Sequence, residues 1–194
     1  FKLADGRFFI VDAGAGGYIT DGRSYKGSSS GWIYATLAKH AADPKNIQVA
    51  AWLITHVHSD HAGGLYDMAL GYYGYSGAKH TVMPKEMKQY IKIDKIIYNA
   101  DNRLVDICMS GAFDADKLIR FGESDNADVK VEKIESCGAN TTISYCYKNK
   151  KESIIVPFTD KGEIENALSC LTFLLLIGEN TNAIKTAVTY PRLH

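Results

Sequence analysis

The sequence lacks an excess of charge of either sign, because 22 lysine and arginine residues balance 22 aspartate and glutamate residues. Proteins that bind nucleic acid through its phosphates usually carry excess positive charge. The balance therefore argues against nucleic acid, and equally against an anionic membrane surface, as the main partner. It leaves small molecules as the favoured ligands and does not indicate an oligomeric state.

Long apolar segments and paired cysteines are missing too. The longest apolar run, Leu171–Ile177 with its flanks, is far shorter than the roughly 20 residues that span a bilayer. The four cysteines contain no CxxC pair, which argues against a zinc ribbon and a dithiol redox motif. We expect these thiols to be reduced and the protein to be cytoplasmic.

The rest of the composition is that of an ordinary globular protein, with 46% hydrophobic and 23% charged residues. A length of 194 residues allows one sizeable core. We expect a single domain over residues 1–194. Because the chain starts at Phe1 and stops at His194, we expect this domain to be incomplete at one or both ends.

Apolar patterns predict alternating strands and helices in the N-terminal half. The short apolar run Phe8–Val11 predicts a strand, and residues 32–42 have the apolar spacing of an amphipathic helix. Residues 49–54 are apolar without alternation, which is typical of a strand buried on both faces. Residues 62–73 can form a further helix.

The C-terminal half is predicted to be mostly β. A weaker helix is expected over residues 113–121. Alternating or apolar segments between Asn, Gly and Lys turns predict the strands that follow, at residues 129–134, 142–147, 153–158 and 168–177.

The segment Thr55–Gly64 places His56, His58, Asp60 and His61 within six positions, directly after the buried strand. An isolated histidine is more often a solvated or hydrogen-bonded side chain than a metal ligand. Three histidines and a carboxylate in one short loop are different, because imidazole nitrogen and carboxylate oxygen suit zinc, iron or manganese. We expect His56 and His58 to face one ion, and Asp60 and His61 to face a second.

This segment resembles the T-H-x-H-x-D-H-x-G-G signature of the metallo-β-lactamase superfamily. The preceding segment Asp5–Gly14 is similar to the family's D-G-R-F-x-I-x-D-x-G strand, and the resemblance extends over residues 4–99. It implies an α/β fold, an αββα sandwich of two mixed sheets flanked by helices. It also implies two divalent metal ions, zinc in the first place, with iron or manganese as alternatives.

The resemblance implies roles for three further residues. Asp12 would brace the histidine loop from behind the metal ligands. Glu179, after a segment that resembles the family's N-x-x-S strand, stands where the family has a bridging aspartate, and His194 is placed like its last histidine. A further family histidine has no counterpart, because residues 81–193 contain none. The number of candidate ligands is therefore smaller than the family's, which leaves open that one or both ions are absent.

The function implied is a metal-dependent hydrolase that uses a metal-bound hydroxide on a small-molecule ester, lactone, amide or thioester. Asp60 would both bind metal and orient the hydroxide. The main alternative is a non-catalytic or degenerate member of the fold that serves as a binding or structural domain. A phosphodiesterase or nuclease is less favoured, because the chain has no excess of positive charge.

Overall fold

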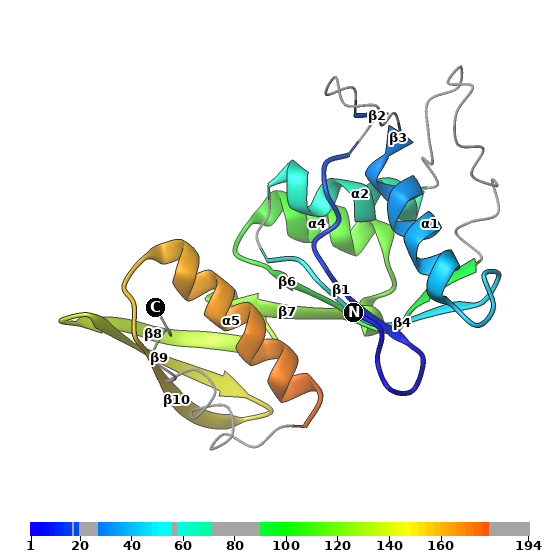
Figure 1. Ribbon diagram of the computed structural model, residues 1–194. Helices are drawn as coiled ribbons and strands as arrows, with labels where there is room; N and C mark the ends of the chain where they lie inside the picture. The colour runs from blue at the N-terminus through cyan, green and yellow to red at the C-terminus, as the bar shows by residue number, and fades with distance from the viewer. Residues whose placement is uncertain (17, 20–26, 56–57, 71–89, 179–194) are drawn as a thin grey trace. The chain divides into compact units, whose positions relative to one another are not determined.

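The computed structural model of the protein describes residues 1–16, 18–19, 27–55, 58–70 and 90–178 (Figure 1). The chain divides into two compact units, one formed by Phe1–Ile96 with Ile107–Leu118 and the other by Ile97–Asp106 with Ile119–His194. The expectation of one domain, incomplete at one or both ends, stays a prediction.

Helices and strands alternate as an α/β chain should. In chain order they are β1 (Phe8–Val11), β2 (Tyr18–Ile19), β3 (Gly27–Ser28), α1 (Ser29–His40), β4 (Ile47–Leu53), α2 (Ser59–Leu70), β5 (Ile91–Ile93), β6 (Ile96–Asn99), α4 (Arg103–Ala112), the 3-10 turn Ala115–Lys117, β7 (Leu118–Gly122), β8 (Val129–Cys137), β9 (Asn140–Tyr147), β10 (Lys150–Val156) and α5 (Lys161–Leu176). Among the helices of the described ranges, none has the length and apolar content that crossing a membrane requires.

The α/β class is confirmed, but the predicted pair of sheets is not. Strand pairing follows the order β1-β4-β6-β7-β8-β9-β10, with β5 beside β4, so these strands form a single mixed sheet of eight. Apart from this sheet, the described part of the chain contains a two-stranded ribbon of β2 and β3. The prediction of an αββα sandwich of two sheets was wrong, in part because it needed a strand where α5 forms.

The parallel pair β1 and β4 forms the centre of the first unit. Phe8 pairs with Val49 and Val11 with Leu53, and β5 continues the parallel arrangement on the other side of β4. Residues 51–54 are all buried, which confirms the prediction of a strand covered on both faces. Because parallel strands end at the same edge, the segments that follow β1 and β4 are brought together.

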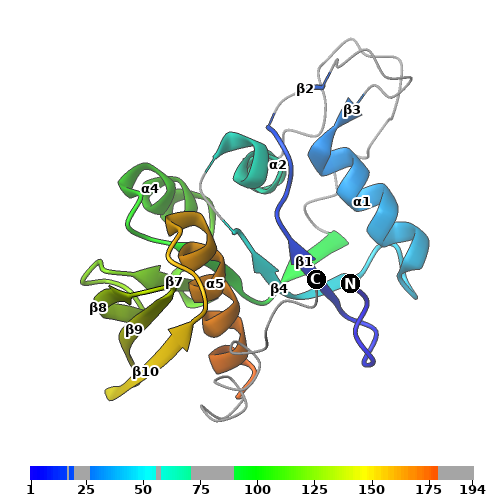
Figure 2. The ribbon, with the colours of Figure 1, turned by 60° about the vertical axis from the view of Figure 1, so that its left-hand side comes forward.

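The second unit contains the antiparallel strands β8, β9 and β10, with α5 lying over one face of them (Figures 1 and 2). Apolar side chains of the strands and the helix form its core, and they include Val129, Val131, Ile143, Tyr145, Ile154, Val156, Ile164, Leu168 and Leu171. The predictions of strands over residues 129–134 and 142–147 are confirmed, and β10 covers most of the third predicted strand.

Residues 168–177 were predicted to form a strand, and this prediction was wrong because residues 161–176 form helix α5. Asp160 caps the helix, since its Oδ1 accepts hydrogen bonds from the amides of Gly162 at 2.9 Å and Glu163 at 3.1 Å. Burial at positions 164, 167, 168 and 171 follows the helical period, although the segment's continuous apolar run resembles a buried strand. The proposed N-x-x-S strand is therefore part of a helix.

The helix predicted at residues 113–121 was also wrong. Helix α4 comes earlier and starts after Asn102, whose Oδ1 accepts from the amides of Leu104 at 3.1 Å and Val105 at 3.3 Å. The 3-10 turn Ala115–Lys117 and the first part of strand β7 occupy the predicted range instead, with Leu118 and Phe121 buried. Asn102 thus caps the start of α4, a local signal that the prediction did not use.

Candidate functional site

The candidate site lies where β1 and β4 end. Beyond the pair Val11–Leu53, the amide of Asp12 still donates to the carbonyl of Leu53 at 2.8 Å, which extends the pairing by one residue. Asp12 is thereby placed beside Thr55, which follows β4. All residues of this site belong to the first unit.

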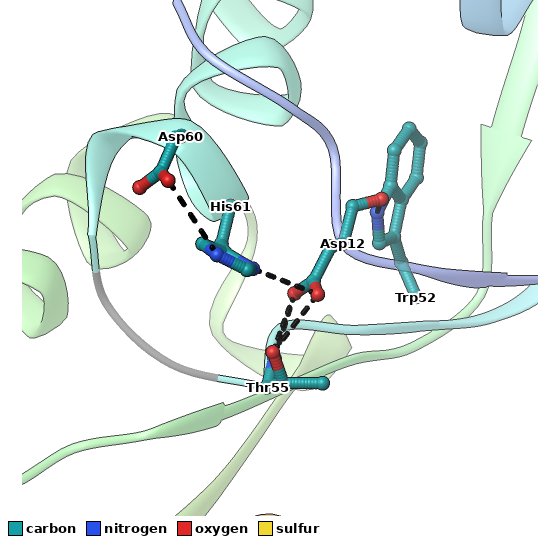
Figure 3. A network of polar contacts seen from close by, with 5 residues as sticks. All are labelled: Asp12, Trp52, Thr55, Asp60 and His61. Carbon is teal, nitrogen blue, oxygen red and sulfur yellow. Dashed lines mark hydrogen bonds and ion pairs between the residues drawn. The ribbon is translucent and has the colours of Figure 1, made fainter. Parts of the chain in front are cut away.

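The backbone of Asp12 is fixed in an uncommon conformation. Its φ is 58°, in the left-handed region that aspartate tolerates better than most residues. The indole Nε1 of the buried Trp52 donates to the Asp12 carbonyl at 3.1 Å (Figure 3). Both backbone polar groups of Asp12 are therefore bonded to residues of β4.

The carboxylate of Asp12 connects the two strand ends to His61 (Figure 3). Its Oδ1 accepts from the amide and the Oγ1 of Thr55, each at 2.9 Å, and Oγ1 is also 2.9 Å from Oδ2. Its Oδ2 lies 2.8 Å from Nδ1 of His61. An ionised carboxylate can only accept a hydrogen bond, so Nδ1 carries the proton in this pair.

Helix α2 presents His61 to Asp12 from its first turn. The carbonyl of His58 accepts from the amides of His61 at 3.0 Å and Ala62 at 3.1 Å, which starts the helix. The loop predicted over residues 56–61 is therefore shorter than expected, since Asp60 and His61 are already helical. The cluster nevertheless follows the carboxyl end of β4, as the sequence indicates.

Two glycines allow α2 to pack closely on the chain after Asp12. A side chain on Gly63 would collide with the backbone of Gly16, and one on Gly64 with the carbonyl oxygen of Ala13. The Gly64 amide instead donates to the Gly14 carbonyl at 2.9 Å, and the Ala13 amide donates to the His61 carbonyl at 2.6 Å. The glycine pair of the motif thus fixes the start of α2 against the end of β1.

The second ring nitrogen of His61, Nε2, faces Asp60 and lies 3.7 Å from its Oδ2 (Figure 3). The side chain of Asp60 is 67% exposed, whereas those of His61 and Asp12 are 28% and 24% exposed. Nε2 and the Asp60 carboxylate thus lie close together on the side of the ring that faces away from Asp12, and both are of the chemical type that can bind a metal ion. Histidine metal ligands commonly bind through one nitrogen and donate the other N–H to a carboxylate.

The predicted site residues divide into those that the structure describes and those outside its described ranges. Asp12, Asp60 and His61 are brought together, and His58 has an exposed side chain just before α2. His56, Glu179 and His194 lie outside the described residues, so their roles as ligands stay predictions.

The described side chains fit part of a metal site. Imidazole nitrogen and carboxylate oxygen are suitable zinc ligands, and the ring is oriented as a ligand's ring should be. Within the described ranges, however, no group of three or more His, Cys, Asp or Glu side chains could hold a metal ion. The donors Asp60 and His61 would need partners from elsewhere, as the predicted cluster assumes.

Thr55 and Trp52 are contacts of Asp12 that the sequence analysis did not identify. Thr55 stands inside the T-H-x-H-x-D-H motif, and this was the available signal for it. A hydroxyl is not a typical zinc ligand, so a search for metal ligands in the sequence does not select Thr55. Trp52 was interpreted as part of a buried strand, and the pattern does not show where its indole N–H points.

Several solved structures of Mur ligases are similar to the chain, with low sequence identity and low TM-scores. MurF from Acinetobacter baumannii is 13% identical with a TM-score of 0.46, covering 76% of this chain and 30% of that one. MurC from Thermotoga maritima, a UDP-N-acetylmuramate-alanine ligase, is 11% identical with a TM-score of 0.47, covering 73% and 29%. The chain thus spans less than a third of these ligases, and such similarities do not indicate an activity.

Comparison of sequences points to a different group. No curated protein matches the chain. The family model described as the metallo-beta-lactamase superfamily matches residues 3–72, a range that contains Asp12, Trp52, Thr55, Asp60 and His61. Residues 3–72 of the chain, with the whole described site, are therefore a partial match to the metallo-beta-lactamase superfamily.

Proposed function

We propose that the chain is a metal-dependent hydrolase that acts on a small-molecule ester, lactone, amide or thioester. The observation that carries the proposal is the arrangement of His61, with Nδ1 on the Asp12 carboxylate at 2.8 Å and Nε2 facing Asp60 at 3.7 Å. The partial family match over the same residues supports it.

His61 and Asp60 would hold one divalent ion, with zinc favoured over iron and manganese. His56 and His58 would hold a second, and Glu179 and His194 are candidate ligands from the end of the chain. The ion at Asp60 and His61 is expected to bind better, because the pair at His56 and His58 lacks the family's further histidine. A bound divalent ion supplies a Lewis acid and lowers the pKa of water toward about 7.

The residues of the chain orient the reacting groups. Asp12 fixes the ring of His61, so that Nε2 points outward rather than into the strands. Asp60, the more exposed carboxylate, can accept a hydrogen bond from an attacking water and hold it beside the substrate. Its place in the first turn of α2 suits a negative charge, because helix N-termini are electropositive.

The balanced charge of the chain favours small substrates over nucleic acid. A phosphodiesterase or nuclease would be expected to show a cationic surface for phosphate groups. Neither the motif nor the described contacts select one acyl substrate among esters, lactones, amides and thioesters.

A non-catalytic binding or structural domain is the alternative. The observation that favours it is the small donor set, because Asp60 and His61 are the two predicted ligands whose donor atoms the described contacts bring together. Such a domain would keep the Asp12–His61 contact for stability. It would bind one ion or none and would not turn over substrate.

Metal analysis combined with a hydrolysis panel separates these functions. The purified chain would be assayed for bound zinc, iron and manganese, and for chelator-sensitive hydrolysis of ester, lactone, amide, thioester and phosphodiester substrates. Asp60→Ala is expected to lower metal content and reduce hydrolysis to background, because it removes a ligand. Asp116→Ala, an exposed aspartate of the 3-10 turn, serves as the matched control and should behave as wild type.

Metal binding without turnover of any substrate would support the non-catalytic alternative. Hydrolysis that survives both the chelator and Asp60→Ala would contradict the proposed function.

A further inference from the structure

We propose that Thr55 and Trp52 are positioning residues: they hold Asp12, and Asp12 fixes His61 with its Nδ1–H on Asp12 and its Nε2 toward Asp60. The inference rests on the proposed function, because the orientation of Nε2 matters most if this atom binds metal. Both residues donate hydrogen bonds to Asp12, and we infer that they act on His61 through it.

Trp52 fixes the backbone of Asp12. The Trp52 side chain is fully buried in β4, so its indole N–H has little freedom to move away from the Asp12 carbonyl at 3.1 Å. The positive φ of Asp12 is a conformation that carries an energetic cost for residues other than glycine. The hydrogen bonds from Trp52 and to Leu53 offset this cost and aim the Asp12 side chain toward α2.

Thr55 fixes the carboxylate of Asp12. Its amide N–H reaches Oδ1 at 2.9 Å, and its hydroxyl lies 2.9 Å from both oxygens but has a single proton to donate. With Oδ1 held by the amide, Oδ2 is left directed at Nδ1 of His61. Rotation of the Asp12 carboxylate would break its contacts with Thr55 and with His61 at once.

With Asp12 held in this way, we expect the neutral ring of His61 to adopt one tautomer, the Nδ1–H form. Nδ1 must donate to the ionised Asp12, so in the neutral ring Nε2 keeps its lone pair. That lone pair is the one able to bind a metal beside Asp60. If the Thr55–Asp12 contact only stabilised the strand ends, its loss would not change the tautomer of His61. A measurement of the tautomer therefore distinguishes a positioning role from a stabilising one.

The test is ¹⁵N NMR of the histidine-labelled chain without metal, at about pH 8, above the usual imidazole pKa. The His61 signals are assigned by their loss in His61→Asn. Wild type is expected to show the Nδ1–H tautomer. Thr55→Val, which keeps the side-chain shape and the amide but removes the hydroxyl, should show a mixture with the Nε2–H form.

Zinc titration of the same proteins gives the second readout. Thr55→Val and Trp52→Phe should bind zinc about ten- to a hundredfold more weakly, the usual effect of removing a group that orients a metal ligand. Thr55→Ser should restore both the tautomer and the affinity. Thr142→Val in β9 makes the same change outside the first unit and should leave both unchanged.

The two proposals fail separately. A wild-type tautomer and unchanged zinc affinity in Thr55→Val would overturn the positioning role while leaving the metal site intact. A wild-type chain that binds no zinc and hydrolyses nothing would contradict the proposed function, whereas the tautomer shift in Thr55→Val would still establish the positioning of His61.

Discussion

Asp12 gathers bonds from three different parts of the chain. Its amide and carbonyl are bonded to β4, and its carboxylate contacts both Thr55 and His61. Because Asp12 is bonded to the buried strand β4, it can hold the more accessible ring of His61 in a fixed orientation. Functional groups held by such contacts keep their geometry better than groups on an unsupported loop.

Asp12→Asn tests the carboxylate while preserving the backbone. Asparagine also tolerates the left-handed region, so the strand end should fold as before. The variant loses the charge that favours donation from Nδ1 of His61, and zinc binding should weaken about ten- to a hundredfold. Isothermal titration with zinc measures this effect. Unchanged affinity would show that the Asp12 charge does not orient His61.

Asp106 should make the stability of the chain depend on pH. Burial alone would raise its pKa, but hydrogen bonds from Arg120 at 2.9 Å, Tyr98 at 2.7 Å and Asn126 at 3.1 Å outweigh this, so the pKa of Asp106 is lowered. The folded-state pKa therefore lies below the unfolded value of about 3.9. The stabilisation is complete above that value and is lost as pH falls through the folded-state pKa.

Asp106→Asn is expected to lower the free energy of unfolding at neutral pH by about 1–3 kcal/mol, since a charged hydrogen-bond acceptor is lost. Urea unfolding at pH 7 and in acid measures the difference from wild type, which should shrink in acid. Asp116→Asn, at an exposed aspartate, should show no such effect. A difference that stays constant with pH would exclude the charged carboxylate as its source.

At the scale of elements, the start of α2 depends on close backbone packing. Gly64→Ala would push a methyl group into the Ala13 carbonyl and within 3.0 Å of Ser29 Cβ, so the helix must shift. We expect the free energy of unfolding to fall by about 1–3 kcal/mol, as overpacked sites usually do. Zinc binding should weaken as well, because the same turn holds His61.

Gly111→Ala is the control, because no neighbouring atom lies within 4 Å of the added methyl group in α4. Alanine is the better helix former, so this variant should keep or raise stability, by up to about 1 kcal/mol. Chemical unfolding compares the two substitutions. If both variants lose stability equally, the packing of α2 on Ala13 is not the reason for the glycine.

Helix α5 forms where a strand was predicted, and its cap can be tested. Asp160→Ala removes the acceptor for the amides of Gly162 and Glu163 and should lower the free energy of unfolding by about 0.5–2 kcal/mol. Asp160→Asn keeps a side-chain acceptor and should lose much less. Thermal unfolding monitored by circular dichroism gives both values. Equal stability of wild type and the alanine variant would contradict the capping role.

The elements around the site could be predicted because local and long-range preferences agree there. The apolar runs of β1 and β4 favour strands, the two strands pair in the sheet, and most of β4 is buried there. Residues 168–177 gave an ambiguous signal, since a continuous apolar run fits a buried strand and a buried helix equally. The Asp160 cap decides in favour of the helix, and it precedes the run by several residues.

At the scale of the whole molecule, the site and the family match occupy the same part of the chain. Residues 3–72 lie within Phe1–Ile96 of the first unit, and the second unit is not covered by the match. A short motif could therefore predict Asp12, Asp60 and His61 as neighbours. It could not predict the single mixed sheet, because the pairing of β7 to β10 depends on contacts far outside the motif.

We propose that Asp60 and His61 hold a divalent ion, with the ring of His61 fixed by Asp12. Anomalous diffraction at the zinc edge, from crystals of the zinc-loaded protein, tests it most directly. We expect a zinc peak about 2.0–2.2 Å from Nε2 of His61 and from a carboxylate oxygen of Asp60, with Nδ1 of His61 still donating to Asp12. Zinc bound elsewhere, or no peak beside His61 in the loaded crystal, would contradict it.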